Sequence, residues 1–181
     1  FKVSKKAWKK GGSKMFVNVN TMVSVEDLIR GIIVQSGNDA CIAIAEGISG
    51  SEALFAEELN YLAKEIGMMN SSFTNSTGWP DPDHLTTIQD LLTLTIRTIE
   101  DFPELYYYYA EKEFTYSGIR QLNRNPLLFN EINADGLKTG HTSLGGYGLV
   151  ASVLKNNRRL ILILNGLKRN KDRSEESERL I

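Results

Sequence analysis

Apolar residues recur at helical spacing in three stretches of the first half of the chain. The stretches are residues 25–35, 40–47 and 51–67. Ser24 and Asp27 begin the first with a capping-box-like pair, and Ser51 and Gly67 mark the start and end of the third. The middle stretch is apolar nearly all round, which predicts a helix in the core of a helical layer. The third carries its apolar residues along one face, at Leu54, Leu59, Leu62 and Ile66.

The pattern differs on either side of these helices. The first 20 residues combine short alternating segments with a Gly-Gly break, which predicts strand and loop. Residues 68–87 are rich in Asn, Ser, Gly and Pro, which predicts a long loop. Thr87 then caps a predicted helix over residues 88–101, and Pro103 begins a short aromatic helix.

Beyond residue 112 the alternation becomes that of β-strands. The predicted strands are residues 113–118, 136–142, 146–155 and 158–166. Asn156 and Asn157 join the last two as a hairpin turn, and an amphipathic helix opens near Arg173. Helices followed by an antiparallel sheet indicate one α+β domain over residues 1–181.

The amino-acid composition excludes few classes of function. The 181 residues are 41% hydrophobic, enough for one domain or most of a larger one. A formal net charge of -1 gives no argument for a nucleic-acid partner or an acidic membrane surface. Cys41 is the single cysteine, so it forms no intramolecular disulfide. No window resembles a transmembrane helix and no leader precedes Phe1, so we expect a mature or truncated product.

Two short motifs carry candidate chemistry. Lys138, Thr139 and Gly140 open a predicted strand, where the lysine could bind a carboxylate or hold a hydroxyl ready for proton transfer. Ser36 and Asn38 flank a glycine between two predicted helices, where a hydroxyl could relay a proton and an amide could donate to a carbonyl. Taken singly, the first motif is more typical of a solvated lysine before a turn, and the second of a helix cap.

Together, the two motifs resemble the second and third signature elements of the penicillin-recognising serine acyl-transferases. Three longer stretches, residues 33–84, 101–128 and 135–166, resemble the low-molecular-mass D-alanyl-D-alanine carboxypeptidases, the type 5 penicillin-binding proteins. The resemblance covers nearly the whole chain. It implies a β-lactamase/transpeptidase-like α+β fold, incomplete here, with an antiparallel sheet packed against a helical layer.

The resemblance also implies roles for individual residues. Ser36 would transfer a proton to the leaving group, Asn38 would contact the substrate amide or orient the catalytic lysine, and Lys138 would bind substrate beside that serine. The strand edge along which an extended peptide lies would be formed by Thr139, Gly140 and His141.

Arg173 matches the arginine that receives the terminal carboxylate in this family. An exposed charge at a helix N-terminus is the alternative interpretation. The family's nucleophile, a Ser-x-x-Lys serine about sixty residues before Ser-x-Asn, has no counterpart in the chain. Ser152 to Lys155 spell the same pattern, but in a strand after Lys-Thr-Gly, so we interpret this match as coincidence. The chain is therefore expected to lack the acylation nucleophile and to be inactive alone.

For the full-length protein, the resemblance implies a serine-type carboxypeptidase that removes the terminal D-alanine of peptidoglycan stem pentapeptides through an acyl-enzyme. β-Lactams would acylate the same serine, no metal or organic cofactor is needed, and no nucleic acid takes part. The protein would be exported to the periplasm or the outer face of the cytoplasmic membrane, with membrane contact only through segments absent from this chain. Two alternatives stay open: a class A-like serine β-lactamase and a non-catalytic peptidoglycan-binding relative.

Two further patterns and one expectation about the surface complete the prediction. Glu57 to Asn60 resemble part of the deacylating motif of class A β-lactamases, but they lie in a predicted helix. His84 and His141 have no third ligand at suitable spacing, which argues against a zinc site. Without the segment before the nucleophile helix, we expect apolar surface to be exposed on the helical layer and one side of the sheet.

Overall fold

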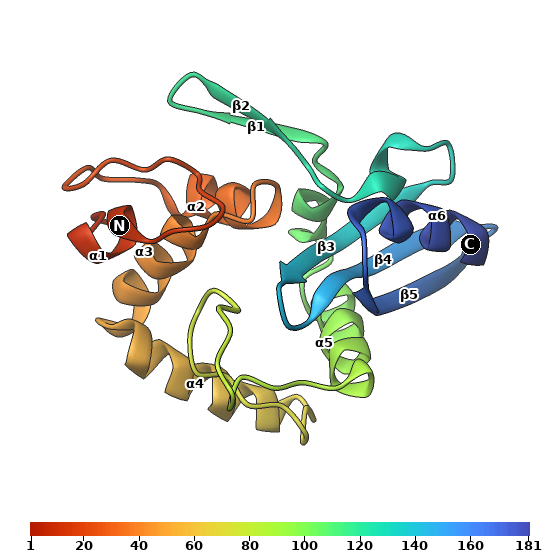
Figure 1. Cartoon of the computed structure of the whole chain (residues 1–181), viewed down its shortest axis with the longest axis horizontal. Helices are drawn as coiled ribbons and strands as arrows, with labels where there is room; N and C mark the ends of the chain where they lie inside the picture. The colour runs from red at the N-terminus through yellow and green to blue at the C-terminus, as the bar shows by residue number, and fades with distance from the viewer.

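The computed structural model describes residues 1–181 and places a group of helices beside a small antiparallel sheet. The red and orange helices of the first part of the chain lie on one side, and the blue strands of the last part on the other (Figure 1). The predicted α+β class is confirmed. None of the helices combines the length and hydropathy that crossing a bilayer requires.

The helices begin largely where the polar residues before them predict. Their bounds are α1 (Lys5–Lys9), α2 (Val25–Ile33), α3 (Asn38–Ser49), α4 (Glu52–Glu65), α5 (Ile88–Asp101) and α6 (Asn170–Leu180). Ser24, Ser51 and Thr87 each accept a hydrogen bond from the backbone N–H three residues later, which satisfies a donor that the first turn leaves free. The caps predicted for α2, α4 and α5 are confirmed.

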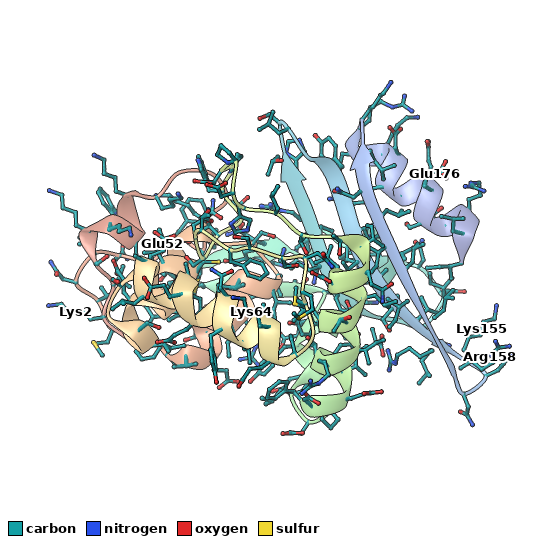
Figure 2. All side chains as sticks on the ribbon, turned by 90° about the horizontal axis from the view of Figure 1, so that it is seen from below. Lys2, Glu52, Lys64, Lys155, Arg158 and Glu176 are labelled. Carbon is teal, nitrogen blue, oxygen red and sulfur yellow. The ribbon has the colours of Figure 1, made fainter.

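The main sheet has the strand order β3-β4-β5. Its strands are β3 (Ala134–Thr142), β4 (Gly146–Lys155) and β5 (Arg158–Leu167), all antiparallel to their neighbours. Asn156 and Asn157 both have positive φ, at 51° and 58°, as the predicted hairpin turn requires. Lys155 and Arg158 stand at the tip of that hairpin, far from the helical group (Figure 2). β3 lies at the edge of the sheet, so only one of its sides is paired.

A second hairpin and two 3₁₀ turns connect the helices to the sheet. β1 (Glu113–Tyr116) pairs with β2 (Ile119–Leu122), and this hairpin projects from the body of the protein (Figure 1). The 3₁₀ turns are η1 (Tyr106–Ala110) and η2 (Pro126–Phe129). η1 contacts β3 and η2 contacts α6, which packs on β4 and β5.

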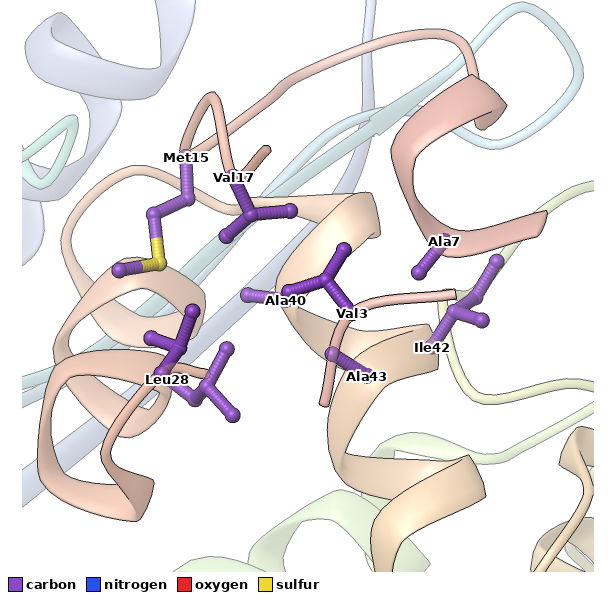
Figure 3. Packing of buried hydrophobic residues seen from close by; sticks show 9 residues of the cluster. Val3, Ala7, Met15, Val17, Leu28, Ala40, Ile42 and Ala43 are labelled. Carbon is purple, nitrogen blue, oxygen red and sulfur yellow. The ribbon is translucent and has the colours of Figure 1, made fainter. Parts of the chain in front are cut away.

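The largest apolar cluster lies in the helical group, where α3 contacts α1, α2 and α4. Figure 3 shows this packing for Val3, Ala7, Met15, Val17, Leu28, Ala40, Ile42 and Ala43, which with Val23 form a buried cluster of 9 residues. A separate cluster of 3 buried residues joins the sheet to η2 and consists of Leu127 from η2 with Leu149 and Ala151 from β4. The helices and the sheet are therefore stabilised by different apolar cores.

Three expectations about local structure were wrong or incomplete. Part of the N-terminal segment is helical rather than strand and loop, because Ser4 caps α1 and Ala7 packs in the core. The sequence pattern also gave no sign of β2, whose residues are mostly exposed. The predicted apolar face of α4 is partly open to solvent, with Leu54 49% and Leu62 51% exposed, whereas Ala56 and Ala63 are buried.

Candidate active site

The Ser-x-Asn motif forms the connection between α2 and α3. Ser36 has a φ of 54°, a left-handed conformation that costs a non-glycine residue about 1–3 kcal/mol unless its surroundings hold it in place. Asn38 begins α3, and its backbone N–H donates to Ser13 O at 2.9 Å. The Asn38 side chain donates to Gly11 O at 2.9 Å. The loop is thus held on one side by residues 11–13.

Asp39 anchors the same segment from the first turn of α3. Its carboxylate accepts the backbone N–H groups of Met15 at 2.8 Å, Phe16 at 2.9 Å and Val17 at 3.3 Å, and the residue is only 1% exposed. Phe16 has a φ of 68°, so the backbone curves around the carboxylate. Hydrogen bonds to a charged acceptor are worth more than neutral ones. Sequence analysis missed this contact, since an aspartate in a first helical turn normally interacts with the helix itself.

Lys138 brings the two motifs together. Its Nζ donates to Ser36 Oγ, which lies 102 positions earlier in the chain, and to Thr139 O at 3.1 Å. Burial, with smaller contributions from the neighbouring Arg124 and Arg173, lowers the pKa of Lys138 to about 8, and Cys41 opposes the shift. An amine with this pKa can both hold and exchange a proton near neutral pH. Lys138 and Ser36 therefore form a pair able to relay a proton.

The end of β3 offers an open strand edge beside this pair. Gly140 and His141 are exposed and Thr139 is half-buried. A Cβ on Gly140 would meet no atom within 4 Å, so the space over this glycine is open. The His141 ring stacks on Tyr147 of β4 with the ring centroids 4.0 Å apart. An extended peptide can pair with such an edge through its own backbone.

Arg173 lies in the first turn of α6 and is only 7% exposed, so it is not an exposed surface charge. Its Nη2 donates to Asn170 Oδ1 at 2.6 Å and, more weakly, to Arg124 O at 3.4 Å. None of the ion pairs of the chain includes Arg173. Burial lowers its pKa, as does the neighbouring Arg124. A buried guanidinium without an acid is costly, so this arrangement favours an anionic ligand.

Arg124 is a second arginine at the site that sequence analysis missed. It is exposed, and its Nη1 donates to Ser13 Oγ at 2.7 Å. Its charge also acts on Lys138 and Arg173, so three cations gather around the open edge of β3. Arg124 lies in a polar turn between β2 and η2, where nothing in the sequence distinguishes a site arginine from a solvated one.

The structure also shows where the two rejected sequence patterns lie, Ser152 to Lys155 and Glu57 to Asn60. Ser152 is buried in β4 and accepts from Arg159, whereas Lys155 is exposed at the hairpin tip, so the two do not interact (Figure 2). Asn60 exchanges hydrogen bonds with the backbone of Phe73, which holds the loop that follows α4. No group of three potential ligands for a metal ion occurs in the chain.

Comparison with known proteins identifies the family and the fold. Residues 1–168 match the family model of the D-alanyl-D-alanine carboxypeptidases, peptidase family S11. The D-alanyl-D-alanine carboxypeptidase DacA of Haemophilus influenzae is 45% identical over 99% of this chain and 47% of its own length. The crystal structure of penicillin binding protein 5 from the same organism superposes with a TM-score of 0.95 at 44% identity, covering 99% of this chain and 54% of that one.

A more distant structure is also similar. Penicillin-binding protein D2 from Listeria monocytogenes in its ampicillin-bound form has a TM-score of 0.80 at 28% identity, covering 87% of this chain and 66% of that one. The fold and the paired motifs define a transpeptidase-like class of protein, the class to which these penicillin-binding proteins belong. Within that class, the chain belongs to the D-alanyl-D-alanine carboxypeptidase family. It spans about half the length of the curated relatives it matches.

Proposed function

We propose that the protein to which this chain belongs is a serine-type D-alanyl-D-alanine carboxypeptidase, and that residues 1–181 are part of its catalytic domain. The observation that carries the proposal is the hydrogen bond from Lys138 to Ser36, next to a buried arginine that has no acidic partner. Proton transfer and carboxylate binding are the two tasks that cleavage of a terminal amino acid requires besides a nucleophile.

In the proposed complex, the stem peptide pairs with the free edge of β3 along Thr139, Gly140 and His141. Its terminal carboxylate is received by Arg173, with Arg124 adding a second positive charge. Asn38 donates its side-chain amide to a carbonyl of the peptide. These contacts place the terminal peptide bond next to Ser36 and Lys138.

The chemistry proposed for the full-length protein proceeds in two steps. A serine outside this chain attacks the carbonyl carbon of the penultimate D-alanine, and the amine of the terminal D-alanine leaves with a proton relayed through Ser36. Lys138 holds the Ser36 hydroxyl in place and stabilises the negative charge that develops. Water then hydrolyses the acyl-serine ester, so the products are free D-alanine and the shortened peptide.

A β-lactam reacts with the same proposed nucleophile, but its amine stays tethered to the acyl group. Peptidoglycan stem peptides and β-lactams are therefore the proposed partners, and the proposed location is the periplasm or the outer face of the cytoplasmic membrane. The β-lactamase alternative requires a deacylating glutamate, and the segment Glu57 to Asn60 is a poor source of one, because Glu57 is exposed on α4 and Asn60 holds the loop that follows. No observation favours the non-catalytic alternative.

The test uses the full-length protein and residues 1–181 in parallel. Incubation with a penicillin followed by peptide mass spectrometry should locate one covalent adduct, on a serine outside residues 1–181, and the fragment should form none. A stem pentapeptide should release D-alanine only with the full-length protein. An adduct within residues 1–181, or no adduct and no D-alanine release with the full-length protein, would contradict the proposal.

A further inference from the structure

Tyr147 has contacts with two of the proposed substrate residues. On β4 it is the register partner of His141, and the two rings stack with an interplanar angle of 29°. The guanidinium carbon of Arg173 lies 5.8 Å from the centroid of the same ring. One half-buried aromatic ring therefore contacts groups from β3 and α6, two elements that are not neighbours in the sequence.

The ring partly compensates the positive charge of Arg173, which the other contacts of this residue leave unbalanced. Asn170 and the Arg124 carbonyl supply neutral acceptors, and no carboxylate balances the buried charge. The face of an aromatic ring carries partial negative charge and attracts a guanidinium within about 6 Å. Unlike an aspartate or glutamate, it does so without forming an ion pair that a ligand carboxylate would have to displace.

We propose that Tyr147 is a positioning residue that keeps Arg173 and His141 in the orientation needed to select peptides ending in a free carboxylate. The inference rests on the proposed function. Tyr147 itself does not touch the reacting atoms; it acts through the guanidinium on one side and the imidazole on the other. Its aromatic ring, rather than its hydroxyl, carries this role, because no hydrogen bond of the hydroxyl is present in the structure and both contacts are to the ring.

The test is a comparison of two peptide substrates with the full-length protein. One ends in D-alanyl-D-alanine with a free carboxylate, and the other is the same peptide as its C-terminal carboxamide. The ratio of their kcat/KM values measures selectivity for the carboxylate. Tyr147→Leu should lower this ratio about fivefold through the acid substrate, the size expected for loss of one partly buried cation–π contact. Tyr147→Phe should keep the ratio of the unchanged protein.

Tyr107→Leu is the matched control, because Tyr107 is 51% exposed and stacks only on Tyr108, its neighbour in η1. It should leave the ratio unchanged. An unchanged ratio in Tyr147→Leu would overturn the inference. If both substrates lose activity equally, the ring serves only in packing. A loss in Tyr147→Phe as large as that in Tyr147→Leu would transfer the role to the hydroxyl.

The two proposals fail in distinguishable ways. If the unchanged full-length protein forms no penicillin adduct and releases no D-alanine, the proposed function is wrong and this inference falls with it. If it does both and the carboxylate selectivity does not depend on Tyr147, only this inference is wrong.

Discussion

The candidate site has two walls: the connection between α2 and α3 around Ser36, and the cations Lys138, Arg124 and Arg173 at the edge of β3. The two walls are held in place by different means. The backbone next to Ser36 is fixed by hydrogen bonds between groups of this chain, chiefly those that the buried Asp39 carboxylate accepts. Around Lys138, three cations gather and Arg173 is left without an acidic partner. In the first wall the buried carboxylate of Asp39 has its hydrogen-bond donors, whereas in the second the buried guanidinium of Arg173 has no acidic partner. This difference supports the proposal that the first wall positions groups and the second binds a charged ligand.

The largest effect is expected from replacing Lys138, the residue that joins the two walls. Lys138→Ala in the full-length protein should lower the rate of penicillin acylation by at least about 100-fold, because the Ser36 hydroxyl loses its charged partner. The melting temperature should stay nearly unchanged, since burial of this lysine lowers its pKa and is unfavourable in itself. Lys155→Ala, at the exposed hairpin tip, is the control and should keep the full rate. A large loss of stability in Lys138→Ala would make the residue structural.

Asp39→Ala tests whether the first wall is structural. It removes the acceptor of the three backbone N–H groups of residues 15–17, so the free energy of unfolding of the full-length protein should fall by about 3 kcal/mol. Chemical denaturation measures the change, and Asp83→Ala, at an exposed loop position, should change it by less than about 0.5 kcal/mol. If the stability of Asp39→Ala matched that of the control, segment 15–17 would be held in place without this carboxylate.

Arg173→Ala tests whether the second wall is a binding surface. Binding of a peptide with a free terminal carboxylate should weaken by roughly 1.5–3 kcal/mol, the range for hydrogen bonds to charged groups. The free energy of unfolding should change less than in Asp39→Ala, because the variant removes an unpaired charge. Arg158→Ala at the hairpin tip should leave peptide binding intact. Unchanged peptide binding in Arg173→Ala would remove the residue from the site.

The pH dependence of stability gives the smallest effect. The folded protein holds the pKa of Lys138 at about 8, below the usual lysine value of 10.5, so the cost of the buried charge is fully present at pH values well below 8. As pH rises from 7.5 to 9 the folded state releases this proton first, so the stability of the full-length protein should rise by about 1 kcal/mol relative to that of Lys138→Met. Parallel denaturation at several pH values measures the difference. A difference that stays constant over this range would mean that Lys138 is better solvated than its position indicates.

Much of the local structure followed from the sequence, because the signals are local. Ser24, Ser51 and Thr87 predicted helix starts since a capping oxygen needs only the N–H three residues later. Asn156 and Asn157 predicted the hairpin turn since both tolerate positive φ. α1 and the open face of α4 were not predictable in the same way, because burial there depends on which distant segment packs against each helix.

For the site, the sequence by itself determined which chemical groups are present and, through two motifs, the family to which they belong. Ser36, Asn38 and Lys138 were identifiable because their spacing and neighbours are distinctive. Only the tertiary structure decided that Lys138 donates to Ser36, that Arg173 is buried without an acid, and that Arg124 and Tyr147 lie beside it. The reason is physical: burial and charge balance arise from contacts between segments far apart in the chain, and no local pattern of residues encodes them.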